Sequence, residues 1–435
     1  MRDRLARVAL AGSLWLGLVA AAAAQTQPMP VQPEPEAEPG DEAAAPLPPP
    51  PPPLLPAGPG GAGIVARSRP RPWQYGLGMG LLYESNIGFD SLQGGAELSG
   101  FAVSPRGSVT RVFWSPRWQL QATADGQWRG YPQHSSLNRY YTNGSLDGSY
   151  RASPATAWNA HIAYGFGYTD SVRILAEQGV QLPLAKTQNL GAWLGVVHRL
   201  GPRMSLRVSA GGNRTTFDQA PPPAPQLNEG QSARVTTGID RRLGARDTAG
   251  IEYSMERTQA GTGSSGRHYL THFGSLQWSH VLTPRSGLLL DAGASYTPQS
   301  TLAGLRQPAG FFGGASYNRK VKRSTLTAFL RREVTPAFGT GVSRLEDRLG
   351  LTAALPIGQR WQLMANGTHV QPHAPSDASS TNAYGRSDDA AFTLSRRLGR
   401  RIDLSAQGSY RRYSGTPVAA TDTYQIGAFV SLVNP

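Results

Sequence analysis

The stretch RWQLQATADGQWRG at residues 117–130 alternates strictly between two kinds of side chain. One set of alternate positions holds Arg, Gln, Thr and Asp, and the other runs from Trp118 to Trp128 through Leu, Ala and Gly. A period of two residues predicts a β-strand. The apolar face is slim in the middle and carries a large aromatic ring at each end, which is typical of a strand that crosses a bilayer.

The composition excludes a helical membrane protein and favours strands. Of the 435 residues only 39% are apolar, and no internal apolar run is long enough for a spanning helix. A transmembrane β-barrel fits this low apolar share, because half of each strand faces a polar lumen. Cysteine is absent, which rules out disulfides, a thiol nucleophile and a lipoprotein anchor.

The N-terminus predicts secretion. Arg2, Arg4 and Arg7 precede an apolar stretch at 8–19, and three alanines at 22–24 follow it, so residues 1–24 are expected to be a cleaved signal peptide. The alternative, a membrane anchor, is disfavoured because the apolar core is short.

Residues 25–72 are rich in Pro, Ala, Glu and Gly and include an unbroken proline run at 48–53. No core can form from this composition, so the segment is predicted to be a disordered periplasmic arm with polyproline II character. Two interpretations stay open: an arm that crosses peptidoglycan or meets a partner protein, and a spacer without specific contacts.

From residue 73 to 435 the alternation continues, and tight turns interrupt it eight times. These turns lie at residues 115–117, 153–155, 200–203, 243–246, 283–285, 322–324, 358–360 and 398–400. Longer polar stretches lie between them, at 169–185, 218–229, 259–267 and 371–383. Short turns on one side and long loops on the other are typical of an outer-membrane barrel.

The number of turns predicts the number of strands. Eight hairpins make sixteen strands, and the alternating segments 73–83 and 423–433 add two, giving about 18. We therefore predict an all-β, antiparallel, up-and-down transmembrane barrel in the Gram-negative outer membrane, with both ends in the periplasm. Its expected partners are outer-membrane lipid and lipopolysaccharide, and the barrel-assembly machinery. A soluble sandwich or propeller would need a large aliphatic core, whereas the outward positions here are often Ala, Gly or Tyr.

The inward set of alternate positions is predicted to be basic. Residues 1–72 carry six basic and six acidic side chains, so the whole formal charge of +14 falls on the barrel. Inward basic candidates outnumber acidic ones about two to one, and such a channel should prefer anions. The lumen candidates are Arg129, Arg207, Arg234, Arg331, Arg348, Asp125 and Glu252. The alternative for these arginines is structural pairing with luminal acids.

Other arginines lie at or beside the tight turns, and they have a simpler interpretation. They are Arg117, Arg203, Arg246, Arg285, Arg360 and Arg400. At the periplasmic rim such residues meet lipid headgroups or mark the topology. A nucleic-acid partner is not expected, because the chain has a secretory signal and no basic run.

Nothing in the sequence predicts catalysis, a metal site or a cofactor. His268 and His272 lie about 13 Å apart if they occupy one strand, which is too far for a shared metal ion. No nucleophile elbow or Gly-rich phosphate loop is present. We therefore expect no catalytic residues and no enzyme.

The first strand ends with Tyr83, Glu84, Ser85, Asn86 and Ile87. This motif, after a Gly-rich apolar strand, resembles the opening of the β-barrel porins associated with bacterial exopolysaccharide secretion. The expected 18 strands are similar as well. The resemblance implies a conduit for an acidic polysaccharide that works with a periplasmic polysaccharide export protein, with mid-strand arginines as sliding contacts. Two alternatives stay open: a general or anion-selective diffusion porin, and a plugged structural or adhesive barrel.

Overall fold

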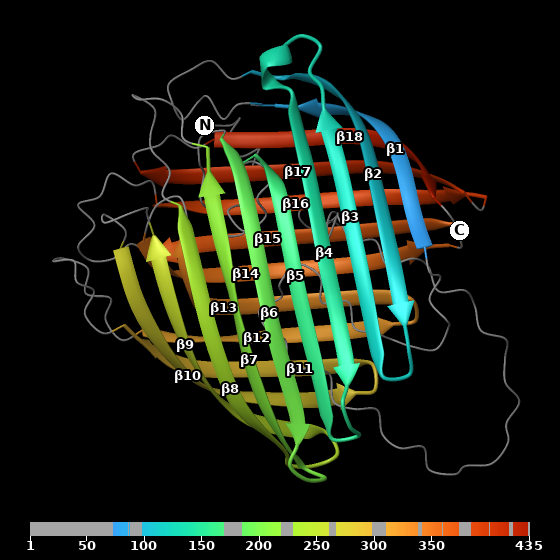
Figure 1. The fold of residues 1–435 in the computed structure, drawn as a ribbon. Coiled ribbons are helices and arrows are strands. Elements are labelled where there is room, and N and C mark those ends of the chain that lie inside the picture. The colour runs from blue at the N-terminus through green and yellow to red at the C-terminus, as the bar shows by residue number, and fades with distance from the viewer. Residues whose placement is uncertain are drawn as a thin grey trace, which may run out of the picture.

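The computed structural model describes residues 73–85, 87, 98–168, 185–218, 229–260, 267–297, 310–337, 342–358, 360–373, 384–399, 401–416 and 421–433. The predicted signal peptide and arm, and Asn86, lie outside the described residues. Within them the structure is a single sheet of 18 antiparallel strands, and β1 pairs with β18, so that the sheet closes into a barrel (Figure 1). The predicted fold class and the strand number are confirmed.

The strands follow one another around the wall in chain order. They are β1 Trp73–Glu84, β2 Gly100–Trp114, β3 Trp118–Arg129, β4 Arg139–Arg151, β5 Thr156–Tyr168, β6 Lys186–Arg199, β7 Met204–Phe217, β8 Gly230–Arg242, β9 Asp247–Ala260, β10 Arg267–Thr283, β11 Ser286–Tyr296, β12 Gly310–Val321, β13 Ser324–Ala337, β14 Val342–Ile357, β15 Trp361–His373, β16 Tyr384–Leu398, β17 Ile402–Thr416 and β18 Thr421–Val433. A short 3-10 helix, η2 Ser135–Leu137, lies between β3 and β4. No helix among these described residues could cross a membrane.

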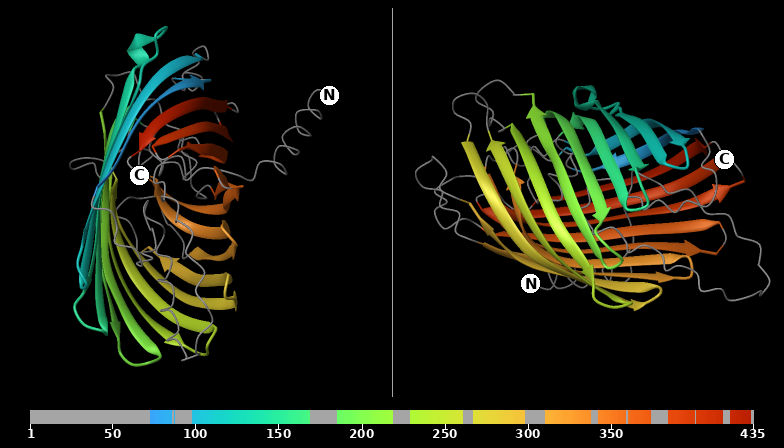
Figure 2. Two further views of the ribbon diagram at one scale, coloured as in Figure 1. Left: turned by 90° about the vertical axis from the view of Figure 1, so that its right-hand side faces the viewer. Right: turned by 60° about the horizontal axis from the view of Figure 1, so that its bottom comes forward.

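All eight predicted turns connect consecutive strands at one end of the barrel, from β2–β3 to β16–β17. The longer connections lie at the opposite end. Short turns face the periplasm in barrels of this kind, so this end is the periplasmic mouth. Strand β1 starts there and β18 ends there, since Trp73 lies opposite Arg111 and Val433 lies opposite Gly76. In Figures 1 and 2 the strands of the front wall cross those of the back wall steeply, as strand tilt requires.

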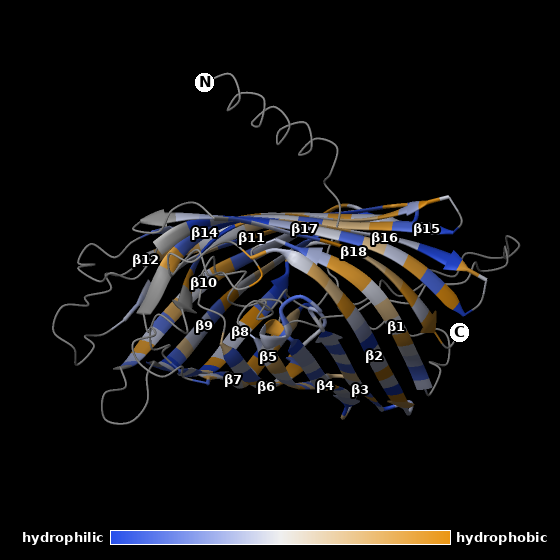
Figure 3. Ribbon diagram, turned by 90° about the horizontal axis from the view of Figure 1, so that it is seen from above, coloured by the Kyte–Doolittle hydropathy of each residue, from blue (hydrophilic) through white to orange (hydrophobic). Residues whose placement is uncertain are grey.

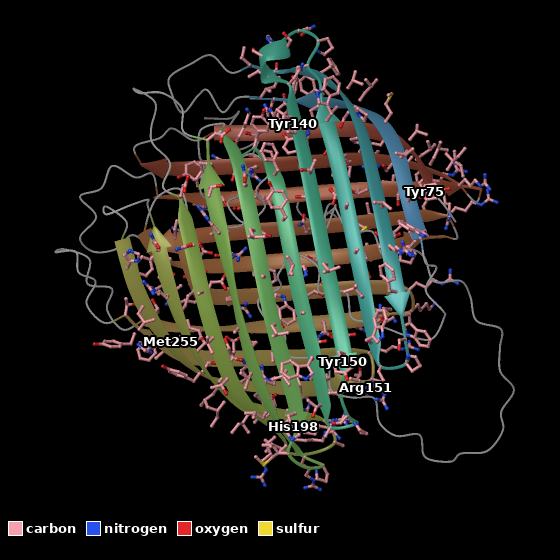
Figure 4. The ribbon with its side chains drawn as sticks, viewed as in Figure 1. Tyr75, Tyr140, Tyr150, Arg151, His198 and Met255 are labelled. Carbon is pink, nitrogen blue, oxygen red and sulfur yellow. The ribbon has the colours of Figure 1, made fainter. Side chains whose placement is uncertain are left out.

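The exterior has the predicted bilayer pattern. Along β1 the outward residues Tyr75, Leu77, Met79 and Leu81 are all exposed, and Figure 3 shows the resulting alternation of hydrophobic and hydrophilic residues along the strands. The quoted stretch forms β3, and its two tryptophans meet tyrosines of β4: Trp118 lies opposite Tyr150, and Trp128 lies opposite Tyr140. Figure 4 shows these two tyrosines near opposite ends of β4. The two tyrosines are ten positions apart along a tilted strand, which gives an apolar band of about 25 Å.

The middle of the inner face of β1 carries no side chains, and neighbouring residues fill the space. Gly76, Gly78 and Gly80 point inward, and a Cβ built on Gly80 would lie 2.2 Å from the Phe429 ring and 2.7 Å from the Ala428 carbonyl oxygen. Gly80 and Phe429 are direct partners across the closing β1–β18 pair. The ring of the last strand therefore occupies the space that a side chain on the first strand would need.

This contact predicts that closure is sensitive to one methyl group. Gly80→Ala should lower the free energy of unfolding by about 1–3 kcal/mol, because the added carbon overpacks the seam. Gly191→Ala on β6 is the matched control, since a Cβ there would meet nothing within 4 Å. Urea unfolding of the barrel refolded into vesicles, followed by tryptophan fluorescence, measures both. Equal losses in the two variants would contradict the role of the Phe429 contact.

Candidate functional site

The inner wall of β7–β10 holds Arg207 between two carboxylates. Its Nε and Nη2 donate to Asp240 at 2.6 and 3.0 Å, and its Nη1 donates to Glu252 at 3.2 Å. Gln277 from β10 bonds to both Arg207 and Glu252. Arg207 is only 8% exposed. Two predicted lumen residues, Arg207 and Glu252, thus meet in one buried network.

Arg234 on β8 lies one layer nearer the long-loop end of the same wall. Its guanidinium donates to the Ser254 hydroxyl at 2.7 Å, lies 3.9 Å from the Glu256 carboxylate, and stands 4.9 Å above the Phe273 ring. The Arg234 side chain keeps more exposure than that of Arg207. Of these two arginines, it has more freedom to meet a solute.

A second network continues the same inner surface on β11–β14, where Asp291 of β11 lies opposite Gln277 of β10. The register places Arg331 opposite Arg348 and Glu333 opposite Glu346, so like charges face each other and ion pairs form diagonally. Arg348 donates to Glu333 at 2.7 Å and lies 3.8 Å from Glu346, which is fully buried. Arg331 lies 3.7 Å from Glu333 and 3.9 Å from Asp291.

These networks show no basic excess among the paired residues of β7–β14. The four arginines face six carboxylates: Asp240, Glu252, Glu256, Asp291, Glu333 and Glu346. Carboxylates outnumber arginines within these networks, and the two-to-one excess over the whole inward set stays a prediction. The pairing that the alternative interpretation required is present, and a permeation role for these arginines stays a prediction.

Some inward charged residues escaped the sequence analysis. Glu333 and Asp389 join the acidic set, and Asp389 pairs with Arg411. Arg106 belongs to the stretch Ser-Pro-Arg-Gly at 104–107, which resembles a turn but lies within β2. Its guanidinium donates to Ser431 and Ser405 and stacks 4.3 Å from Phe429, at the closing seam. The alternation through residues 101–113 was the signal that could have identified it.

The motif at the end of β1 fixes the long-loop end of the seam. Glu84 points inward, accepts a hydrogen bond from the Tyr131 hydroxyl and lies 3.5 Å from Arg129. Burial, and then the Glu84 charge, raise the pKa of the Tyr131 phenol, so it stays protonated and donates. Arg139 from β4 donates to the Ile87 carbonyl.

The other motif residues have different partners. Tyr83 faces outward and packs edge-on against Phe101, 5.1 Å between ring centroids, and near Tyr424. The Ser85 hydroxyl accepts from the Tyr424 amide at 2.9 Å, and the Ser85 amide donates to the Tyr424 carbonyl at 3.0 Å. Among the predicted site residues, Arg129 thus belongs to the motif cluster, while Asp125 lies apart from it and accepts from Asn143 at 3.0 Å.

The periplasmic mouth carries the unpaired positive charge. The eight short turns contain no acidic residue. We name their eight described basic residues, all exposed, the collar; they are Arg117, Arg203, Arg246, Arg285, Lys322, Arg323, Arg360 and Arg401. None of them forms an ion pair with a residue that the structure describes. The positive charge of the barrel is therefore concentrated at this end.

The backbone holds further basic residues beside the collar. The Arg117 carbonyl accepts from the Arg151 amide at 2.7 Å, and the Arg285 carbonyl accepts from the Lys320 amide at 2.7 Å. The Arg203 carbonyl likewise accepts from the Arg242 amide at 2.8 Å. Figure 4 shows Arg151 at this end of the barrel. Basic residues next to one another raise the local positive potential, and this favours anions.

The described part of the chain holds no group of three or more residues that could bind a metal ion. A closed barrel with an apolar, aromatic-edged exterior and a charged interior is the architecture of Gram-negative outer-membrane proteins. The chain is an outer-membrane β-barrel.

No protein-family model and no curated protein matches this chain. Among solved structures it is similar to the outer membrane protein opdK from Pseudomonas aeruginosa, with a TM-score of 0.41 and 12% identity over 83% of this chain and 98% of that chain. The siderophore receptor PirA from the same species has a TM-score of 0.43 and 8% identity, covering 84% of this chain and 81% of that chain. The FrpB iron transporter from Neisseria meningitidis has a TM-score of 0.45 and 9% identity, covering 84% of this chain and 82% of that chain.

The Arg207 network predicts a stability effect. Arg207→Gln should lower the free energy of unfolding by about 2 kcal/mol, because Asp240 and Glu252 would then face each other with one cation fewer. Adding Asp240→Asn and Glu252→Gln should restore most of the loss. Arg199→Gln on the neighbouring strand, exposed and without an ion pair to a described residue, is the control. A triple variant as unstable as the single one, in urea unfolding, would argue against this network.

The Glu84–Tyr131 bond predicts local protection of the segment between β3 and β4. Tyr131→Phe should weaken the fold there by about 1–2 kcal/mol, because the buried carboxylate loses its donor. Hydrogen exchange at the amides of His134, Leu137 and Asn138 should then become faster by about tenfold. The outward-facing Tyr164→Phe serves as the control. Unchanged exchange in Tyr131→Phe would show that Glu84 does not hold this segment.

Proposed function

We propose that the chain forms an outer-membrane channel that favours anionic solutes, which it collects at the collar. The observation that carries this proposal is the distribution of charge: the mid-wall arginines of β7–β14 are paired with carboxylates, while the collar lies in water without ion pairs to described residues. Unpaired guanidinium groups around a channel mouth raise the local concentration of carboxylates and phosphates.

We further propose that the anion is an acidic exopolysaccharide, delivered by a periplasmic polysaccharide export protein. Support comes from the resemblance of the motif at 83–87 and from the position of the collar on the periplasmic side, where an exported polymer would enter. Weak, repeated contacts with many arginines suit a moving polymer better than one tight site. A diffusion channel for small anions is the competing candidate, and the same collar favours it.

Ion selectivity in planar bilayers tests the channel proposal. A variant with Arg203, Arg246, Arg285, Lys322, Arg323 and Arg360 all changed to Gln should show a roughly 3- to 10-fold lower anion-to-cation permeability ratio than the natural chain, because mouth charges set the local ion concentrations. Arg214→Gln with Arg257→Gln, two exposed residues near the other end of the barrel, is the control. If Arg234→Gln alone abolishes the preference for anions, the residues that select anions lie in the middle of the wall and not at the collar. If the natural chain shows no conductance, a plugged barrel is favoured.

The polymer proposal needs a separate measurement. Removing the chain from a polysaccharide-producing host should abolish surface polysaccharide, and the variant with six collar residues changed to Gln should restore less of it than the natural chain. Normal polysaccharide without the chain would leave the small-anion channel as the function.

A further inference from the structure

We propose that the acidic segment 34–42 of the N-terminal arm docks on the collar of its own barrel. The segment carries Glu34, Glu36, Glu38, Asp41 and Glu42 and no basic residue. It is the one run of the arm with net negative charge, because the other charged residues of 25–72 are three arginines near the barrel. A run of carboxylates is complementary in charge to a ring of cations that form no ion pair with the described residues.

The spacing of the charges fits. Successive turns are separated by two strands, which places them roughly 10 Å apart along the rim. A proline-rich chain favours polyproline II, which rises about 3.1 Å per residue, so segment 34–42 would span about 25 Å. One extended segment would therefore meet the basic residues of two or three neighbouring turns at once.

The segment between the acidic residues and the barrel is long enough to reach the collar, and it joins the barrel at the periplasmic end. Strand β1 begins at Trp73 beside the periplasmic mouth, as its pairing with Arg111 next to the first turn shows. The residues between Glu42 and Trp73 form a tether with a mean reach on the order of 30 Å if flexible and up to about 90 Å if extended. The mouth of an 18-stranded barrel is on the order of 40 Å across, so much of the collar is within reach.

Other basic residues at this end lie on the outer surface. Arg111 and Arg396 face outward and stack on aromatic rings: Arg111 lies 4.4 Å from the Trp73 ring, and Arg396 lies 5.1 Å from the Trp361 ring. Rings and cations in this arrangement are typical of the headgroup region. The collar lies beyond them, in the turns, where a periplasmic ligand has access. Charge complementarity and tether length therefore favour the chain's own arm over lipid headgroups as its occupant.

A docked segment would occupy cations that the proposed channel offers to its solutes, and this consequence rests on the proposed function. An arm tethered at the mouth has a local concentration in the millimolar range, so it competes with any anion that the collar collects. An acidic polymer with many charges would displace it, while dilute small anions would not.

The absence of cysteine allows a direct distance measurement on the full mature chain. Ala37→Cys in the arm and Ala245→Cys in an exposed turn are spin-labelled, and the barrel is placed in phosphatidylcholine vesicles. We expect a short-distance population at low ionic strength that is lost at about 0.5 M salt, where screening is strong. It should also be lost when the five acids become Gln or Asn, but not when the uncharged residues 43–58 are shuffled.

Several results would overturn the proposal. One is a distance distribution that is the same for the natural and the neutral arm, and another is release of the arm when part of the lipid is phosphatidylglycerol, which would assign the collar to lipid. Conductance separates docking from function: the neutral arm should raise anion conductance at low salt about twofold. If the arm docks but neither the natural chain nor the chain with the neutral arm prefers anions, the proposed function alone is refuted. If the channel prefers anions but the arm does not dock, the arm proposal alone is refuted.

Discussion

Closure of the backbone ladder between β1 and β18 is the constraint on which the rest of the molecule depends. Hydrocarbon offers no partner for an unpaired amide or carbonyl, so a sheet in a bilayer must have no edge. Nine residue pairs from Gly76 to Glu84 meet this requirement, and the Ser85 hydroxyl and amide extend it by one more residue of β18, Tyr424. The alternation along each strand then separates lipid from lumen.

The distribution of charge follows from the same wall. In the partly buried inner surface an unpaired charge is costly, and Arg207, Arg331 and Arg348 accordingly lie among carboxylates. At the mouth, water and salt reduce the repulsion between neighbouring cations to about 1 kcal/mol or less, so Arg117 and Arg151 can lie side by side. A high net positive charge is therefore compatible with a stable barrel when it is placed at the rim.

The sequence predicted the fold well because its signals are local. Period-two alternation identified β3, and turns such as 200–203 marked hairpins without knowledge of distant residues. The site was less predictable because ion pairs depend on the register between strands. Sequence alone could not show that Arg331 lies opposite Arg348, or that Glu333 therefore bonds to it diagonally.

Two particular residues show where local signals end. Arg106 is absent from the predicted lumen residues, although Ser-Pro-Arg-Gly continues a strand whose proline faces outward. Glu84 was recognised only as part of a motif. Its contacts with Tyr131 and Arg129 arise because a segment far along the chain returns to the seam, and no local pattern encodes that return.

The glycine face of β1 has a consequence for assembly. Only at the observed register does the Phe429 ring lie over Gly80; a shift of the last strand by two residues would bring it against Leu82 on one side, or over Gly78 and the Arg106 guanidinium on the other. The last step of barrel closure is therefore sensitive to the register of β18 against β1. A misaligned closing strand would press the ring against the Leu82 side chain or would require the Arg106 side chain to move.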